Sequence, residues 1–323
     1  MKHGFKYNEF GVVGPGGAHD SKITGARVIS FSETHPSSSV HGPYAGNPLA
    51  GRDVLRLLDL SPDEMRLVLD VAAAQKADWK AGIYEHPYPE KAVAVILEKP
   101  SLRTRNSFQV GIRRLGAQPV IMSDANSAFS RGESIKDTVM VLERFVDCIV
   151  IRTYAQERIE EIAHWAQIPV VNALTDGFHP CQVLADFQTI EERKGPLADQ
   201  VVAYVGDGNN MAHTYLEGAA LSGMQLRIAT PAGFEPNPDI VAECEAMAQQ
   251  TGASLSIGRD PMQAVEGADV VITDTWTSMG EEAEHDARLA AFQGYQVNAD
   301  LLAQAKDDAI FLHCLPAHRG EEV

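Results

Sequence analysis

The chain has 323 residues, 45% of them hydrophobic and 22% charged, which is the composition of a globular protein long enough for two domains. Its 27 Lys and Arg stand against 44 Asp and Glu, a formal net charge of −17 that argues against nucleic-acid binding, because contact with phosphate backbones needs a basic face. No apolar stretch approaches the roughly 20 residues of a membrane span, and the first ten residues hold no apolar signal core, so we expect a cytoplasmic protein without a membrane partner. The four cysteines lack the spacing of metal sites or disulfide frameworks, so we expect reduced thiols and no metal.

Residues 1–46 are rich in Gly, Ser, His and Pro and show no sustained hydrophobic period. This composition predicts a disordered or non-native extension, such as a tag or translation from an upstream start. Ordered structure is expected from about Asn47. The stretch SPDE at 61–64 then predicts the start of a helix, with a serine cap, a proline at the first helical position and a glutamate three residues after the cap.

Nine short apolar runs follow in two series, and helix-like stretches separate them. The first series lies at 92–97, 119–122, 148–151 and 169–171, and the second at 201–205, 226–229, 254–257, 269–273 and 309–312. This alternation predicts an α/β protein with two doubly wound parallel-sheet domains. We expect domains at 47–185 and 186–323, with the segment VLADFQTIEERKG near 183–197 as the helix that links them. Ligands of such sheets bind beyond the carboxyl ends of the strands, so candidate site residues are sought there.

The first run ends in EKPSLRTR, which concentrates hydroxyl and guanidinium groups at Ser101, Arg103, Thr104 and Arg105. Apolar residues at 108, 110 and 112 suggest that a helix starts at this motif. Backbone N–H groups at a helix start, the positive end of the helix dipole and a planar guanidinium together form an anion site. The alternative is that both arginines are ordinary solvated charges on a helix surface.

Two further strand ends of the first series carry polar side chains. Arg152 follows the third run, and its position is equally consistent with a surface ion pair and with a ligand-binding role. The fourth run leads to His179-Pro180-Cys181-Gln182, in which the histidine and the glutamine are placed to donate hydrogen bonds to an oxygen. The alternative is a structural role for His179. The candidate anion-binding groups at 101–105 and Arg152, which are expected at the same sheet edge, argue against this alternative.

In the second series, the run at 201–205 is followed by GDGNNM, which partly matches a dinucleotide fingerprint. Met211 stands where that fingerprint needs a third glycine, and the next run ends without an acidic residue for a ribose, so NAD binding is disfavoured. Asn209 and Asn210 suit either an amino-acid ligand or local turn stabilisation.

The last two strand ends carry Asp274 and Cys314. Asp274 could accept hydrogen bonds from a cationic amine, and Gly280 could act as the hinge of a mobile loop. Cys314 is either a nucleophile or a buried spectator thiol, and no motif for an oxyanion site or a paired base marks it as the former.

Five stretches in order resemble the aspartate/ornithine transcarbamylase family, and its ornithine-specific members most closely. They are SLRTR at 101–105, HPCQ at 179–182, GDGNN at 206–210, the D-x-W-x-S-M-G pattern at 274–280 and HCLP at 313–316, and the resemblance spans roughly residues 47–323. Aspartate enzymes differ at HCLP and putrescine enzymes lack the SMG signature, so ornithine is favoured.

The resemblance implies a carbamoyl phosphate-binding first domain and an ornithine-binding second domain. It also implies transfer of the carbamoyl group to the neutral δ-amine of L-ornithine through a tetrahedral intermediate, in a homotrimer without a cofactor. By the same resemblance, Arg152, His179, Asp274 and Cys314 are the catalytic residues. The implied substrate-binding residues are Ser101, Leu102, Arg103, Thr104, Arg152, His179, Gln182, Asn210, Asp274, Ser278, Met279, Cys314 and Leu315.

Two departures from the family pattern bear on these expectations. Leu102 stands where a threonine is common, which removes a hydroxyl and keeps the backbone N–H. Family members continue past HCLP into a further helix that brings an arginine to the carbamoyl group, whereas this sequence stops at Val323, so we expect that helix to be lacking. An inactive transcarbamylase-like fragment that binds ligand or a partner without turnover is therefore the second hypothesis.

Overall fold

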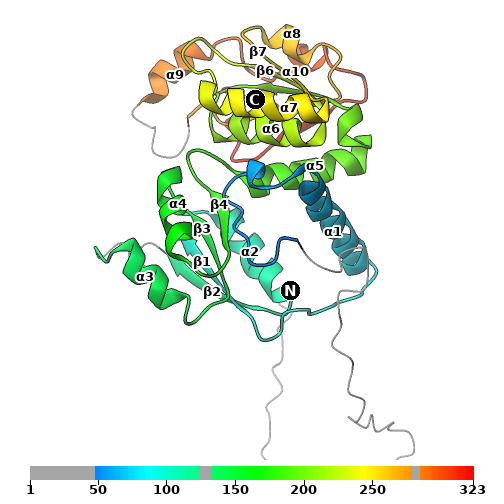
Figure 1. Ribbon diagram of the computed structural model, residues 1–323. Coiled ribbons are helices and arrows are strands. Elements are labelled where there is room, and N and C mark those ends of the chain that lie inside the picture. The colour runs from blue at the N-terminus through cyan, green and yellow to red at the C-terminus, as the bar shows by residue number, and fades with distance from the viewer. Residues whose placement is uncertain (1–47, 124–131, 278–283) are drawn as a thin grey trace, which may run out of the picture. The chain divides into compact units, whose positions relative to one another are not determined.

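The computed structural model describes residues 48–123, 132–277 and 284–323. The predicted extension at 1–46 and the predicted hinge Gly280 lie outside these residues. The strands form two separate sheets. Figure 1 shows helix α1 (Pro62–Lys80) next to helix α5 (Pro180–Lys194), and the two helices contact each other. The helix predicted from SPDE is confirmed: Ser61 Oγ accepts a hydrogen bond from Glu64 N at the start of α1.

The first sheet is parallel, with the strand order β2-β1-β3-β4. Its strands are β1 (Ala92–Leu97), β2 (Gln118–Ser123), β3 (Cys148–Arg152) and β4 (Val170–Leu174), which confirm the four predicted runs. Strand β4 extends beyond the apolar run at 169–171 because Asn172 N donates to Val54 O (2.9 Å), so that a segment before the sheet pairs with its edge.

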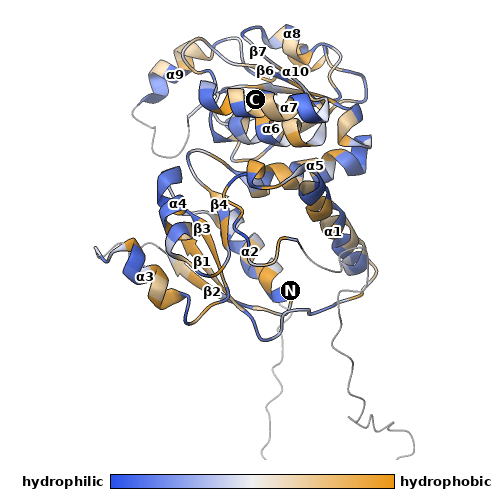
Figure 2. Ribbon diagram, in the orientation of Figure 1, coloured by the Kyte–Doolittle hydropathy of each residue, from blue (hydrophilic) through white to orange (hydrophobic). Residues whose placement is uncertain are grey.

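Helices cover both faces of the first sheet. They are α2 (Leu102–Arg114), α3 (Ile135–Leu142) and α4 (Gln156–Trp165). Ile96 packs with α3 and α4 on one face, whereas Val95 packs with Ile112 of α2 on the other, as the alternation of side chains along a strand requires. Figure 2 shows these strands as largely hydrophobic and the helices as mixed, which is the pattern of a sheet that is buried on both faces.

The second sheet is also parallel, with the strand order β7-β6-β5-β8-β9. Its strands are β5 (Val201–Val205), β6 (Gln225–Ala229), β7 (Ser254–Gly258), β8 (Val270–Thr273) and β9 (Ile310–His313). Its helices are α6 (Asn210–Ser222), α7 (Pro238–Thr251), α8 (Pro261–Val265), α9 (His285–Ala291) and α10 (Ala299–Leu302). The predicted class, α/β with two doubly wound parallel sheets, is therefore confirmed. None of the helices in the described part of the chain combines the length and apolar composition that a membrane span requires.

One hydrophobic core joins the second sheet to a segment that precedes the first sheet. Leu57 in the short 3-10 helix η1 (Leu57–Asp59) and Met65 in α1 pack with Phe187 of α5 and with Tyr204 of β5. Glu217 of α6, which is buried, accepts hydrogen bonds from Leu57 N (2.8 Å) and Arg56 Nε (2.5 Å) and so fixes η1. The linking helix is α5, followed by η4 (Leu197–Asp199). The boundary at 185/186 stays a prediction, and this core extends across it.

The strand orders define where each sheet can bind a ligand. In the first sheet the chain moves from β1 to β2 on one side and then to β3 on the other, so the order reverses between β1 and β3. In the second sheet it reverses between β5 and β8. Crevices at such switch points lie beyond the carboxyl ends of the strands and are the usual ligand sites of open parallel sheets. The segments that start at Glu98, Thr153, Gly206 and Asp274 line these two crevices.

The glycine at 218 in α6 is needed because Phe187 packs against it. A Cβ atom at this position would lie 2.6 Å from the Phe187 ring and 3.2 Å from Leu57 Cδ1. Overpacking of a core typically costs about 1–3 kcal/mol, which exceeds the gain of about 1 kcal/mol in helix propensity from Gly to Ala. We expect Gly218→Ala to lower the urea midpoint of unfolding.

The matched control is Gly111→Ala in α2, where, apart from the neighbouring residues and the helix backbone, no atom of the described residues lies within 4 Å of the added Cβ. This variant should leave the urea midpoint unchanged or raise it, because only the helix propensity changes. A higher midpoint for Gly218→Ala as well would contradict the packing argument.

Candidate active site

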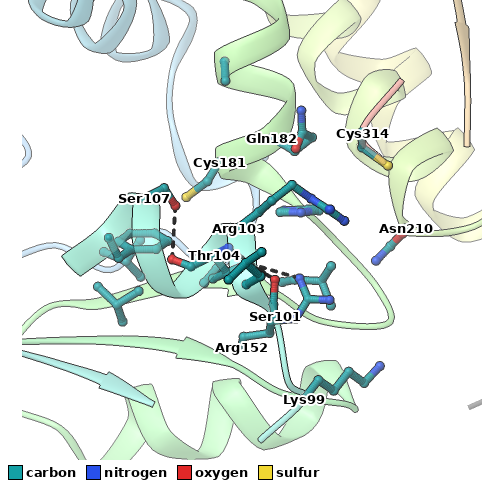
Figure 3. A pocket seen from close by; sticks show the side chains of 18 of the residues that line it. Lys99, Ser101, Arg103, Thr104, Ser107, Arg152, Cys181, Gln182, Asn210 and Cys314 are labelled. Carbon is teal, nitrogen blue, oxygen red and sulfur yellow. Dashed lines mark hydrogen bonds between the residues drawn. The ribbon is translucent and has the colours of Figure 1, made fainter. Parts of the chain in front are cut away.

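One cavity of about 1210 Å³ receives residues from both switch points. The predicted site residues that the structure describes all line it: Ser101, Leu102, Arg103, Thr104, Arg152, His179, Gln182, Asn210, Asp274, Cys314 and Leu315. Figure 3 shows labelled members of this set around the pocket, with Ser101 and Thr104 at the start of α2 and Cys314 beyond Gln182. The predicted residues Ser278 and Met279 lie outside the described part of the chain.

The start of α2 forms the first part of the cavity wall. Ser101 is the N-cap: its Oγ accepts from Thr104 N (3.2 Å) and donates to Thr104 Oγ1 (3.0 Å). The N–H groups of Leu102 and Arg103 belong to the first helical turn, where no intrahelical acceptor exists. The Leu102 side chain is 78% exposed, so its backbone is the part suited to a ligand. The geometry is that of an anion site at a helix N-terminus.

Two guanidinium groups face this helix start. Arg152 Nη1 donates to Thr104 Oγ1 (3.3 Å), and Arg103 Nη2 donates to the carbonyl oxygen of Leu315 (2.6 Å). Burial lowers the pKa of Arg152, and the charge of Arg103 lowers it further. A bound dianion would relieve the repulsion between these two cations. The register between β3 and β4 shifts at Ile151/Arg152, and such irregularities re-aim a side chain next to a site.

Lys99 is a cavity residue that the sequence reasoning missed. Its ammonium group forms an ion pair with Asp176 and lies 4.5 Å from the centroid of the Tyr154 ring. It places an ammonium donor in the wall two residues before Ser101, and its partner Asp176 lines the same cavity. Its place within EKPSLRTR was the available signal.

His179 and Gln182 line the cavity from the start of α5. His179 N donates to Thr214 Oγ1 of α6 (2.8 Å), and Gln182 N donates to His179 O (3.2 Å). Burial lowers the pKa of His179 to about 3, with a contribution from the charge of Arg152, so the imidazole is neutral at pH 7. Its Nδ1 atom is buried and has no hydrogen-bond partner among the described residues. A neutral imidazole carries one N–H donor, which suits a carbonyl oxygen.

Asp274, at the end of β8, is held by donors from three directions. Its Oδ1 atom accepts from Thr275 N (2.7 Å) and Cys314 Sγ (2.9 Å), and its Oδ2 atom accepts from Asn209 Nδ2 (2.9 Å). The residue is 7% exposed. A carboxylate accepts about four hydrogen bonds, so capacity for a ligand cation is left. Asn209 thus orients the carboxylate across the β5/β8 switch point. The sequence alone did not decide between a ligand-binding and a turn-stabilising role for Asn209, because its bond to Asp274 depends on the order of the strands.

Cys314 is a hydrogen-bond donor in this arrangement. Burial raises the pKa of its thiol far above the usual range, and the neighbouring Asp274 carboxylate raises it further. The thiolate is the reactive form of cysteine, so a protonated thiol is unsuited to nucleophilic attack. Of the two alternatives left open by the sequence, the geometry favours a thiol that does not react covalently and that orients Asp274.

The GDGNN stretch has structural roles that account for its composition. A Cβ atom at Gly208 would lie 2.4 Å from Phe234 O and from Pro236 N, so only glycine fits against this loop. Asn210 Nδ2 donates to Thr175 O (2.7 Å), which ties the start of α6 to the loop after β4. The amide oxygen of Asn210 is the part of this side chain left for a ligand.

Comparisons with known proteins agree with the resemblance seen in the sequence. The carbamoyl-P binding domain of the aspartate/ornithine carbamoyltransferases matches residues 52–192, and their Asp/Orn binding domain matches residues 198–323. The chain is 50% identical over 275 residues to the ornithine carbamoyltransferase of Symbiobacterium thermophilum, covering 85% of this chain and 89% of that protein. It is 49% identical over 273 residues to that of Carboxydothermus hydrogenoformans, covering 84% and 88%.

Solved structures give the same result. Ornithine carbamoyltransferase from Pyrococcus furiosus superposes with a TM-score of 0.82 at 44% identity, covering 85% of this chain and 88% of that chain. The anabolic enzyme from Campylobacter jejuni gives a TM-score of 0.80 at 37% identity, covering 84% and 88%. By both domain matches and by these similarities, the chain belongs to the aspartate/ornithine carbamoyltransferase family.

Proposed function

We propose that this protein transfers the carbamoyl group of carbamoyl phosphate to the δ-amine of L-ornithine, giving L-citrulline and phosphate. The observation that carries the proposal is that the two switch points open into one cavity, with an anion site at one and the Asp274 carboxylate at the other. Relatives that share about half of its residues bear the name ornithine carbamoyltransferase.

The phosphate of carbamoyl phosphate would bind at the start of α2. Ser101, Arg103 and Thr104, with the backbone N–H of Leu102, supply donors and positive charge there. Charge-assisted hydrogen bonds to a guanidinium are about twice as strong as neutral ones. This local site explains how a chain of net charge −17 can hold a small dianion.

The carbamoyl group would face Arg152, His179 and Gln182. A donor from Arg152 and the N–H of the neutral His179 suit the carbonyl oxygen, on which negative charge builds up during attack. Fixed donors of this kind typically contribute a few kcal/mol each to transition-state stabilisation. Gln182 is placed to contact the carbamoyl nitrogen.

L-Ornithine would bind at the second switch point. Asp274 would accept from its α-ammonium group, with Asn210, Ser278 and Met279 as further contacts. Cys314 and Leu315 would border the reacting centre, where Cys314 orients Asp274 and Leu315 O contacts Arg103.

The reaction is then direct attack within one cavity. The lone pair of the neutral δ-nitrogen forms a bond to the carbamoyl carbon, and the tetrahedral intermediate expels phosphate as its C–O bond breaks. The nitrogen loses one proton, and the departing phosphate can accept it. An acyl phosphate is already activated, so the proposed chemistry requires neither a covalent enzyme intermediate nor a cofactor. Holding both substrates in attack geometry supplies much of the acceleration.

The role proposed for Cys314 gives a test. Cys314→Ala removes one hydrogen bond to Asp274, whose net contribution is about 1 kcal/mol, so kcat/KM for ornithine should fall about fivefold. In Cys314→Ser, which retains a hydrogen-bond donor, kcat/KM for ornithine should fall less. A fall of four orders of magnitude, with a carbamoylated Cys314 found by mass spectrometry in the wild type, would instead identify a nucleophile.

Citrulline formation tests the proposed function itself. Purified protein is supplied with carbamoyl phosphate and, in parallel, with L-ornithine, L-aspartate or putrescine, and phosphate release and carbamoylated product are measured. The proposal expects turnover with ornithine and little with the other two amines. A folded protein that binds carbamoyl phosphate but turns over none of them would favour the alternative of a non-catalytic binding protein.

We also propose that the chain assembles as a homotrimer, an implication of the family resemblance. Exposed apolar side chains, including Val141 (56% exposed) and Phe145 (73%), support contact with another surface. Sedimentation equilibrium would measure the mass. The cytoplasmic location stays a prediction from the composition.

A further inference from the structure

We propose that Asp186 is a positioning residue that fixes the amide of Gln182, so that the protein distinguishes a carbamoyl group from an acetyl group. The inference rests on the proposed function and assigns the residue that sets the choice of acyl group. Asp186 lies on α5 one helical turn after Gln182, and its Oδ1 atom accepts from Gln182 Nε2 (3.1 Å).

The carboxylate of Asp186 is itself held from a second element. Its Oδ2 atom accepts from the hydroxyl of Tyr215 on α6 (2.6 Å). Tyr215 is buried, and its ring packs against Phe187 and Tyr204, each with ring centroids 6.1 Å away. The Tyr215 hydroxyl is therefore a fixed donor, and it sets the position of the carboxylate that Gln182 meets.

This arrangement determines which end of the Gln182 amide faces the cavity. A carboxylate only accepts hydrogen bonds, so Nε2 must face Asp186, and a rotated amide would place Oε1 against a carboxylate oxygen. Gln182, which lines the cavity, therefore offers Oε1, an acceptor. Figure 3 shows Gln182 between α5 and Cys314, at the edge of the pocket.

An acceptor at this place suits the NH₂ group of a carbamoyl group. A methyl group in its place would leave Oε1 desolvated and without a donor. A site built to hydrogen-bond a ligand NH rejects an analogue without it more strongly than an apolar pocket rejects a size change.

The test uses two stable probes that differ only in this group: phosphonoacetamide, with NH₂, and acetonylphosphonate, with CH₃. Their dissociation constants are measured by calorimetry. The wild type should bind phosphonoacetamide at least roughly tenfold more tightly, as expected for one hydrogen bond with a buried acceptor. In Asp186→Ala, the affinity for phosphonoacetamide should fall by about that factor, whereas the affinity for acetonylphosphonate should change little. The ratio of the two dissociation constants, acetonylphosphonate over phosphonoacetamide, therefore falls towards one.

Three variants separate positioning from a structural role. Asp186→Asn retains the shape of the side chain but can donate to Oε1 of a rotated Gln182, so the ratio should fall although folding is preserved. Tyr215→Phe removes the donor that fixes the carboxylate and should lower the ratio, but less than Asp186→Asn does, because Gln182 Nε2 can still donate to Asp186. Glu191→Gln, on the same helix, disrupts an ion pair with Arg66 away from the cavity and should leave the ratio unchanged.

A double-mutant cycle completes the test. In a Gln182→Ala background, Asp186→Asn should no longer change the ratio, because both act through one amide. An unchanged ratio in folded Asp186→Asn and Asp186→Ala would overturn the inference while leaving the proposed function intact. If the wild type binds neither probe, both the proposed function and this inference fail.

Discussion

Arg103→Ala is expected to weaken carbamoyl phosphate binding by about two to three orders of magnitude. The guanidinium lines the cavity at the start of α2, and two hydrogen bonds to a phosphate dianion at about 1.5–3 kcal/mol each account for this loss. The substitution also removes the bond to Leu315 O, so ornithine affinity should fall as well. Calorimetry with carbamoyl phosphate or its stable analogue phosphonoacetamide measures the first effect directly.

The matched control is Arg113→Ala, which removes the same charge from an exposed position near the other end of α2. It should bind the analogue within about twofold of the wild type, because exposed charges beyond a Debye length are largely screened. Affinity like that of the wild type in Arg103→Ala would show that the phosphate does not bind at the start of α2.

Asp274→Ala is expected to raise the KM for ornithine by about two orders of magnitude while leaving the affinity for phosphonoacetamide within about threefold. Asp274 is the buried carboxylate at the second switch point, and a hydrogen-bonded ion pair in such a site contributes several kcal/mol that the truncated residue cannot replace. Steady-state kinetics with varied ornithine, beside calorimetry, separates the two substrates.

Asp239→Asn serves as the control for this substitution, since it removes one negative charge from an exposed position at the start of α7. Its ornithine KM should equal that of the wild type. Equal losses of ornithine and phosphonoacetamide binding in Asp274→Ala would assign Asp274 to the fold rather than to ornithine.

The nine strands within the described residues were predictable because each is a short apolar run bounded by polar or turn residues. Even β7, which is largely exposed, carries the β-compatible stretch SLSI and matched the prediction. The start of α1 was equally clear from its capping residues, since their hydrogen bonds are local. Such local signals do not specify strand order. The positions of the two switch points therefore came only from the structure, as did the packing of Leu57 against Phe187.

The residues of the candidate site also differ in whether local sequence signals identify them. Residues at strand ends, such as Arg152 and Asp274, could be found because parallel strands end at one edge. Residues that act through others, such as Asn209 on Asp274 and Asp186 on Gln182, could not be assigned a role, because their partners are chosen by tertiary contacts. The roles of Ser278 and Met279 were implied by the family resemblance alone and stay predictions.

In the proposed reaction, one cavity holds both substrates side by side. The most direct measurement is calorimetric titration with a stable molecule in which a phosphonoacetyl group is joined to the δ-nitrogen of L-ornithine. We expect one molecule to bind per chain, with an affinity well above that of phosphonoacetamide or ornithine, because linking two ligands that fill adjacent sites removes an association cost. We also expect this gain in affinity to be lost in both Arg103→Ala and Asp274→Ala. Binding no tighter than phosphonoacetamide alone would contradict a shared cavity.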